Sequence, residues 1–244
     1  MSLFKVDNEM QAEIERVRRE TARRDREISH SRYGWQSPVN LLFHSHLVRA
    51  CIAALSGRNK YPLDDFRVLD VGCGPGTWLL EFAQWGAKPG SIAGIDLDST
   101  RIARAMERMS EADLRIGDAQ TLPWPNESFD VVTQFTVFSS ILDGRVKARM
   151  ASEMRRVLRP GGLILWYYFR VNNPGNKSVK GIRIAEVRRL FPDCSVEPRS
   201  ETLLPPLARA VVPVSWLAAE VLCLIPLLRS HYLAVIQPRR GQTT

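Results

Sequence analysis

Cysteine is scarce in this sequence, and the few cysteines that it has lie far apart. They are Cys51, Cys73, Cys194 and Cys223, and no two of them form a CxxC pair. This spacing excludes the usual zinc-binding and redox motifs, so we expect no metal site. Scattered thiols are typical of a reducing compartment. A cytoplasmic location is therefore expected.

Long apolar runs are missing as well. No stretch of about 18 uninterrupted apolar residues occurs, so we expect no membrane-spanning helix. The opening residues, MSLFKVDNEMQAEIERVRRE, are too polar for a secretory signal. These absences favour a cytoplasmic protein, and a peripheral position at the inner face of the membrane is the alternative.

Acidic residues are outnumbered by basic ones, which gives a formal net charge of +8. A basic balance favours anionic partners such as nucleic acid or a phospholipid surface, but a solvated basic surface explains it more simply. No RNA-recognition motif with stacking aromatic residues is present. Nucleic acid is therefore not the expected partner.

The chain divides into an N-terminal helical extension over residues 1–60 and one α/β domain over 61–244. Helices are predicted from Asn8 to Ile28 and from Val39 to Leu55. Glu–Arg pairs four residues apart support the first helix, and Gly57 ends the second. Neither helix has enough apolar surface for a core of its own, so together they form a cap rather than a domain.

From Phe66 onward, short apolar runs alternate with amphipathic stretches. RVLDV, SIAGIDL, ADLRIGD, SFDVVTQF and LILWYYF are predicted strands, and CSVEPRSETLL and HYLAVIQP are predicted as the two final strands. Strands that alternate with helical patterns indicate a doubly wound, mostly parallel sheet with helices on both faces.

A glycine-rich turn follows the first of these strands. The stretch VLDVGCGPG places Gly72, Gly74 and Gly76 directly after a strand that ends at Val71. Ligands of open α/β sheets bind at the carboxyl ends of the strands, and glycine lets the backbone turn sharply and approach a ligand closely. The amides of the helix expected from Thr77 favour negative charge. The turn predicts a ligand with a carboxylate or phosphate, and a purely structural turn is the alternative.

Two carboxylates narrow the choice of ligand. Asp96 ends the next strand, where an acidic side chain can accept hydrogen bonds from ribose hydroxyls. A nicotinamide dinucleotide site prefers G-x-G-x-x-G, whereas this turn reads G-x-G-x-G. Asp70, just before the first glycine, suits an ammonium or sulfonium group better than a phosphate. These residues favour S-adenosylmethionine over NAD.

Four motifs in order, VLDVGCGPG, GIDLD, IGDAQTLPWPNESFDVV and EMRRVLRPGGLILWYYF, resemble those of class I S-adenosylmethionine-dependent methyltransferases. They look most similar to the type-11 group, which includes the ubiquinone and menaquinone methyltransferases. The resemblance covers residues 66–169. It implies a Rossmann-like methyltransferase fold, in which a seven-stranded sheet has one antiparallel strand near its edge.

The resemblance also implies roles for matching positions. Asp96 would bind the ribose, and Leu97 would pack on the adenine. Asp118 and Ala119 would lie at the adenine edge, although helix caps are the alternative for Asp96 and Asp118. The positions implied to surround the methionine part and the reacting centre are Asp70, Gly72, Cys73, Gly74, Gln134 and Phe135.

Residues for the acceptor and for proton transfer are indicated less directly. His44, His46 and Tyr33 are candidates for a general base, with exposed or hydrogen-bonded side chains as the alternative. Tyr33 and Trp35 would cover the cofactor unless they pack in the core. Candidate acceptor-binding residues at the end of the fifth strand are Tyr167, Tyr168, Arg170 and Asn172.

An apolar stretch over residues 203–229 separates the last two strands. Pro213 and Pro226 interrupt it, and so do three charged side chains, so it cannot span a bilayer as written. We expect a helical insertion. It would be a lid over an apolar acceptor, a membrane-contacting element, a homodimer surface or a helix packed on the body of the chain.

The predicted function is transfer of a methyl group from S-adenosylmethionine, by in-line displacement, to a small-molecule, glycan or lipid-linked acceptor. The donor is already activated, so the chain must hold the acceptor and the methyl group close and aligned. A nicotinamide-dependent oxidoreductase, an RNA methyltransferase and a non-catalytic relative are the alternatives. Against the RNA enzyme, TQFTVF stands where base-methylating enzymes carry asparagine–proline–proline–tyrosine.

Overall fold

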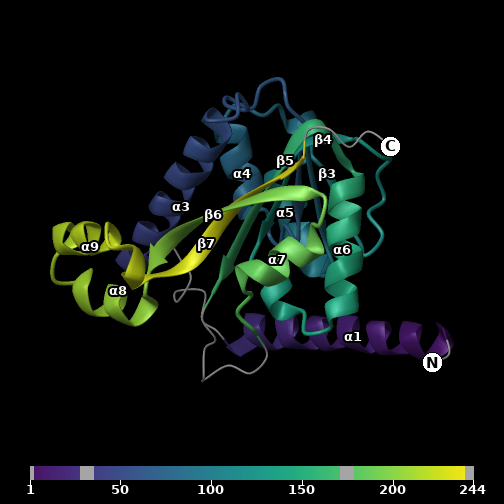
Figure 1. Ribbon diagram of the computed structural model, residues 1–244, viewed down its shortest axis with the longest axis horizontal. Helices are drawn as coiled ribbons and strands as arrows, with labels where there is room; N and C mark the ends of the chain where they lie inside the picture. Colours follow the sequence, from purple (N-terminus) through teal and green to yellow (C-terminus); the bar gives the residue numbers. More distant parts are fainter. Residues whose placement is uncertain (1–2, 28–35, 171–178, 240–244) are drawn as a thin grey trace.

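A seven-stranded sheet forms the centre of the fold (Figure 1). The computed structural model describes residues 3–27, 36–170 and 179–239, so Tyr33, Trp35 and Asn172 lie outside the described residues. The strand order is β3-β2-β1-β4-β5-β7-β6, and every neighbouring pair is parallel except those of β7, which runs antiparallel to β5 and β6. The predicted fold class is confirmed. The strands are β1 (Val68–Val71), β2 (Ile92–Asp96), β3 (Asp113–Ile116), β4 (Phe129–Phe135), β5 (Leu158–Phe169), β6 (Cys194–Leu203) and β7 (Arg229–Pro238).

Helices bury both faces of the sheet. Successive side chains of a strand point to opposite faces, so Tyr167 packs with α3, α4 and α5, whereas Trp166 and Tyr168 pack with α1, α6 and α7. Coverage of both faces is usual for parallel strands. The helices are α1 (Leu3–Glu27), α3 (Pro38–Ser56), α4 (Thr77–Gln84), α5 (Ser99–Arg108), α6 (Gly144–Arg156), α7 (Ile184–Leu190), α8 (Pro205–Val211) and α9 (Trp216–Cys223).

The two N-terminal helices form close to where the sequence predicts them. Pro38 stands in the first turn of α3, and the Ser37 hydroxyl accepts a hydrogen bond from the Asn40 amide at 3.5 Å, which fixes the start of this helix. Among the described residues, α3 is the one helix that is long and apolar enough to cross a membrane. Its buried side chains pack against the sheet and the insertion, so it serves as a packing helix of this fold.

The insertion between the last two strands consists of α8, α9 and the short helix η3 (Pro226–Leu228), and it projects from the body at the left of Figure 1. Its inner side packs against the N-terminal half of α3. Val39 and Leu42 from α3 meet Ala208, Val212 and Ala219 from the insertion in a small separate core. The outer side carries several exposed apolar side chains.

The turn between β1 and α4 is tied to the neighbouring strand. The amides of Gly72 and Cys73 both donate to the Ile95 carbonyl, at 2.8 and 3.1 Å. Gly72 has a φ of +78°, and a Cβ atom added there would lie 2.2 Å from Val137 Cγ2. Gly74 also has a positive φ, of +53°, but an added Cβ would meet nothing within 4 Å. The surrounding structure therefore leaves no room for a side chain at Gly72, whereas it leaves room for one at Gly74.

Gly72→Ala should therefore lower the free energy of unfolding by about 2–4 kcal/mol, because a left-handed conformation and a clash in a packed region add together. Gly74→Ala, the matched control, should cost only about 1–2 kcal/mol, since it meets the conformational penalty alone. Urea denaturation of both variants measures the difference. Equal losses would mean that Val137 does not restrict the turn.

Candidate functional site

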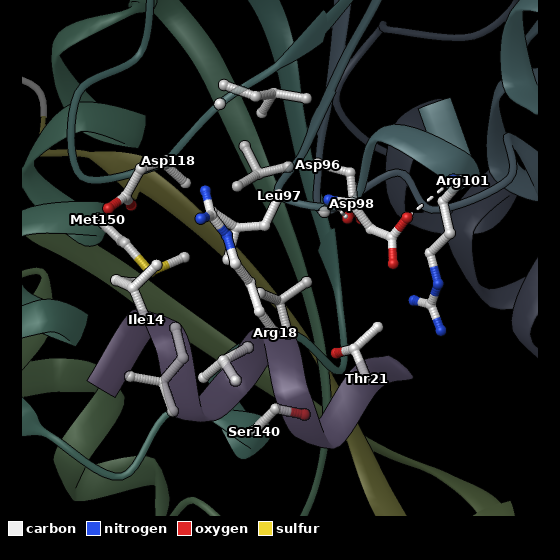
Figure 2. A pocket seen from close by; sticks show the side chains of 18 of the residues that line it. Ile14, Arg18, Thr21, Asp96, Leu97, Asp98, Arg101, Asp118, Ser140 and Met150 are labelled. Atoms are coloured by element: carbon white, nitrogen blue, oxygen red, sulfur yellow. Dashed lines mark hydrogen bonds between the residues drawn. The ribbon is translucent and has the colours of Figure 1, made fainter. Parts of the chain in front are cut away.

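A pocket opens at the carboxyl edge of the sheet, over the ends of β1, β2 and β4 (Figure 2). Gly72 borders it from the glycine turn, and Asp96 and Leu97 border it from the end of β2. Asp118 and Ala119 lie on its far side, in the loop after β3. These five are among the residues that the sequence assigns to the cofactor, and Phe135 is a sixth. The side wall is α1, which contributes Ile14, Val17, Arg18 and Thr21.

Asp96 links the glycine turn to the turn that follows β2. One carboxylate oxygen accepts from the Gly74 amide and the other from the Asp98 amide, both at 3.0 Å. Burial raises the pKa of Asp96, while these two amides oppose the rise. The cap of α5 is Asp98, which accepts from the amides of Thr100 and Arg101. The helix-cap alternative for Asp96 is therefore wrong.

Asp118 is held by its neighbour Gln120 at the opposite side of the pocket. Its two carboxylate oxygens accept from the backbone amide and the side-chain amide of Gln120, at 2.9 and 2.8 Å. No helix begins there in the part of the chain that the structure describes, so the cap alternative fails here too. Asp96 and Asp118 thus present two fixed acceptors at opposite ends of one pocket.

Three other residues assigned to the cofactor lie behind the pocket. Asp70 is 2% exposed and accepts from the Thr133 hydroxyl at 2.7 Å. Cys73 packs into the core shared with α3, α4 and α5, and burial raises the pKa of its thiol. Gln134 is fully buried, and its side-chain oxygen accepts from the Val137 amide at 2.7 Å. In this structure they support the walls of the pocket rather than line it.

Helix α1 is held over the pocket by charged groups as well as by apolar packing. Glu13 accepts from the amides of Leu142 and Asp143. Arg16 donates to Glu13 and, at 2.5 Å, to the Ser140 carbonyl. This latch joins α1 to the segment that follows β4. Sequence reasoning missed the wall, although residues 14, 17, 18 and 21 recur at the spacing of one helical face.

A row of aromatic rings runs along the carboxyl edge away from the pocket. Phe135 stacks on Trp78, with ring centroids 4.1 Å apart and planes 17° apart. Tyr167 lies 6.3 Å from Phe135 and stacks on His231 at 5.0 Å and 6°. We call Trp78, Phe135, Tyr167 and His231 the aromatic row. Because Phe135 also lines the pocket, the row begins at the edge of the pocket.

The other predicted acceptor residues lie apart from this row. Tyr168 is fully buried on the opposite face of the sheet, among residues that pack with α6 and α7. The Arg170 guanidinium donates to the Tyr232 hydroxyl at 3.3 Å. Asn172 lies outside the described residues. Among the predicted acceptor residues, Tyr167 is the one that the structure brings into the row.

The two histidines predicted on α3 make hydrogen bonds to carboxylates. His44 Nε2 lies 2.7 Å from Glu81 of α4, and His46 Nε2 lies 2.9 Å from Glu220 of α9. His44 also stands close to Trp78, with ring centroids 5.3 Å apart. Both histidines therefore join α3 to a neighbouring helix.

His231 is a histidine that the sequence analysis did not single out. The Ser230 hydroxyl lies 3.3 Å from the Thr202 carbonyl and 2.9 Å from His231 Nδ1. The Ser230 hydroxyl has one proton, which it donates to the Thr202 carbonyl, so its oxygen must accept a hydrogen bond from His231 Nδ1–H. The imidazole tautomer with the proton on Nδ1 has a lone pair on Nε2. Burial lowers the pKa of His231 from 6.5 to about 4. The imidazole is thus neutral near pH 7.

Residues 68–162 match a family model described as a methyltransferase domain. Over this segment the chain resembles the class I S-adenosylmethionine-dependent methyltransferases. A probable S-adenosylmethionine-dependent methyltransferase of Mycolicibacterium smegmatis is 37% identical over 98 residues, which are 40% of this chain and 36% of that protein. A demethylmenaquinone methyltransferase of Listeria monocytogenes is 35% identical over 100 residues, 39% of this chain and 41% of that protein. This chain therefore spans less than half the length of either relative.

Solved structures with a similar fold support this resemblance. The magnesium protoporphyrin IX methyltransferase of Synechocystis PCC 6803, with bound S-adenosylmethionine, has a TM-score of 0.58 at 16% identity. The match covers 85% of this chain and 88% of that one. It therefore extends well beyond the matched methyltransferase domain.

The pocket fits the cofactor in the chemistry of its lining. Gly72 leaves its floor free of a side chain where a Cβ would meet Val137. Leu97 and Ala119 provide apolar surface, and Asp96 and Asp118 provide acceptors for hydroxyl and amino groups. The buried Asp70 carboxylate lies next to the turn in sequence and favours positive charge nearby.

Asp70 should make stability depend on pH. Burial raises its pKa from 3.8 to about 7, so between these values the native state holds a proton that the unfolded state has lost. The free energy of unfolding should fall as the pH rises through that window. Relative to Asp70→Asn, which does not titrate, the wild type should lose up to roughly 4 kcal/mol between about pH 4 and pH 8. Urea denaturation across this range is the measurement, and parallel stability curves would contradict the prediction.

Proposed function

We propose that this chain transfers a methyl group from S-adenosylmethionine to an acceptor with a flat apolar part, within the class of small-molecule and lipid-linked acceptors. The observation that carries the proposal is the pocket in which a side-chain-free turn meets Asp96 and Asp118 at the carboxyl edge. The match of residues 68–162 to a methyltransferase domain supports it.

Each part of the pocket has a task toward the cofactor. When bound, S-adenosylmethionine supplies a methyl group already activated on a cationic sulfur. Asp96 would accept hydrogen bonds from ribose hydroxyls, and Asp118 would accept one from the amino group of the adenine. Leu97 would pack against the purine. Helix α1 excludes water from the open side, because Ile14 and Val17 are buried there.

The aromatic row would bind the acceptor. Its rings follow one another from Phe135, at the pocket, to His231, at the start of β7. Aromatic faces favour offset stacking with another ring. The demethylmenaquinone methyltransferase that resembles this chain is named for a quinone-type acceptor, which is in keeping with such a surface.

His231 would take the proton of a hydroxyl acceptor. A general base must be neutral at the working pH and must present a lone pair to the proton. His231 is neutral near pH 7 because burial lowers its pKa, a shift that also makes it a weaker base. Its hydrogen bond to Ser230 leaves Nε2 to present the lone pair. Tyr167 supports this orientation by stacking on the imidazole.

Asp96→Ala should weaken the binding of S-adenosylhomocysteine at least tenfold, as expected when a ribose loses its acceptor. Asp98→Asn is the matched control, because it lies in the same turn and keeps an oxygen that can cap α5. Isothermal titration with S-adenosylhomocysteine and with NADH measures both. Equal affinities of the two variants would remove Asp96 from the ribose role, and binding of NADH alone would favour an oxidoreductase.

His231→Gln should lower kcat about 10²-fold or more with a hydroxyl acceptor, while affinity for S-adenosylhomocysteine stays unchanged. His46→Gln, which loses only its bond to Glu220, is the control.

The acceptor is first found by methyl transfer from labelled donor into lipid, glycan and RNA fractions of a cell extract. A His231→Gln enzyme with normal kcat would exclude His231 as the base, and label confined to RNA would favour an RNA methyltransferase.

A further inference from the structure

The insertion exposes a concentrated apolar surface. Of the large apolar side chains exposed in the described residues, most belong to one segment that runs from Val214, just before α9, to Leu227 in η3. Clustering of this kind marks an interaction site, whereas single exposed apolar residues are ordinary. We call this surface the apolar tip, and it consists of Val214, Trp216, Leu217, Val221, Leu224, Ile225 and Leu227.

The apolar tip is distinct from the contacts that hold the insertion in place. Ala219 and Cys223 of α9 face inward and are buried against α3. Leu217 is 74% exposed and Leu224 is 73% exposed on the same helix and just past its end. The helix thus has an inner side that packs on the protein and an outer side whose apolar side chains are exposed to water.

The charge around the apolar tip is positive. Glu220 is the one acidic residue between residues 204 and 230. It is already engaged by His46 at 2.9 Å, by Arg49 at 3.6 Å and by the Trp216 indole N–H at 3.2 Å. Arg209 is exposed, and Arg229 bonds only to carbonyl groups of Cys223 and Ser200 in the described structure. This surface therefore attracts an anionic partner.

The position of the insertion relates the apolar tip to the aromatic row. β6 ends and β7 begins where Leu203 pairs with Arg229, and His231 pairs with Phe169 at the end of β5. The insertion therefore leaves the sheet at its carboxyl edge, beside the last member of the row, and projects outward from it (Figure 1). A surface that receives the apolar tip is brought next to the acceptor side of the site.

We propose that the apolar tip docks the protein on an anionic phospholipid bilayer. Leucine, valine and tryptophan side chains enter the boundary between headgroups and acyl chains, while the neighbouring arginines contact lipid phosphates. Trp216 suits this boundary because its indole is apolar with one polar N–H. Docking in this way presents lipid-embedded acceptors to the aromatic row. That last step rests on the proposed function, whereas docking itself does not.

Sedimentation of the full-length chain with phosphatidylcholine vesicles, with and without phosphatidylserine, tests the proposal. The wild type should bind vesicles that contain phosphatidylserine, and salt should weaken the binding. Leu217→Glu/Leu227→Glu should reduce vesicle affinity at least tenfold, because charges replace two exposed leucines that docking would bury in the bilayer. Met106→Glu, at a side chain that is 45% exposed on α5, is the control and should bind as the wild type does.

Quenching by brominated lipid provides a second readout. Brominated lipid should quench part of the tryptophan fluorescence of the wild type. In Trp216→Phe this quenching should disappear, because the tryptophan proposed to enter the bilayer is gone. Equal vesicle binding by the wild type and the double variant would overturn the proposal. The proposal would also be overturned if the wild type did not bind vesicles but formed a dimer that the double variant does not form. Titration with S-adenosylhomocysteine is run in parallel, and retained affinity in every variant separates a failure of docking from a failure of the cofactor site.

Discussion

The hydrogen bond from the Gly74 amide to Asp96 is the contact on which the rest of the site depends. The glycine turn has backbone donors that lie away from water and must be satisfied. The end of β2 satisfies them, through the Ile95 carbonyl and the Asp96 carboxylate. The turn therefore takes its shape from the neighbouring strand. One carboxylate both shapes the floor of the pocket and remains at its border.

Electrostatics then restricts what the pocket can hold. Burial raises the pKa values of both Asp70 and Asp96, because a low-dielectric surrounding penalises their charged forms. A phosphate beside them would add like charge to that penalty, whereas a cationic ligand would relieve it. The preference for a sulfonium nucleoside over a dinucleotide thus follows from desolvation as much as from the spacing of glycines.

Features set by local chemistry could be predicted from the sequence, and features set by packing between distant segments could not. The mostly parallel sheet, the turn and the place of Asp96 follow from alternating elements that end at one edge, and the resemblance to methyltransferases indicated Asp118. The α1 wall depends on the Glu13–Arg16 latch to residues far along the chain, and no local pattern fixes that register. His231 lies at the start of a strand that reads as ordinary β structure, and only the antiparallel pairing with β5 brings it to Tyr167.

Two segments outside the matched domain flank the reacting edge, and each has a different physical relation to it. Helix α1 closes the cofactor side by burying its own apolar face. The insertion does the opposite at the far end of the aromatic row, since it keeps apolar groups exposed. Exposing such groups in water is unfavourable unless a partner covers them. In this fold α8 and α9 hold these apolar groups outward, and Glu220, the one acidic residue near them, is already paired. This arrangement supports the proposal that the acceptor reaches the protein from a membrane surface rather than from solution.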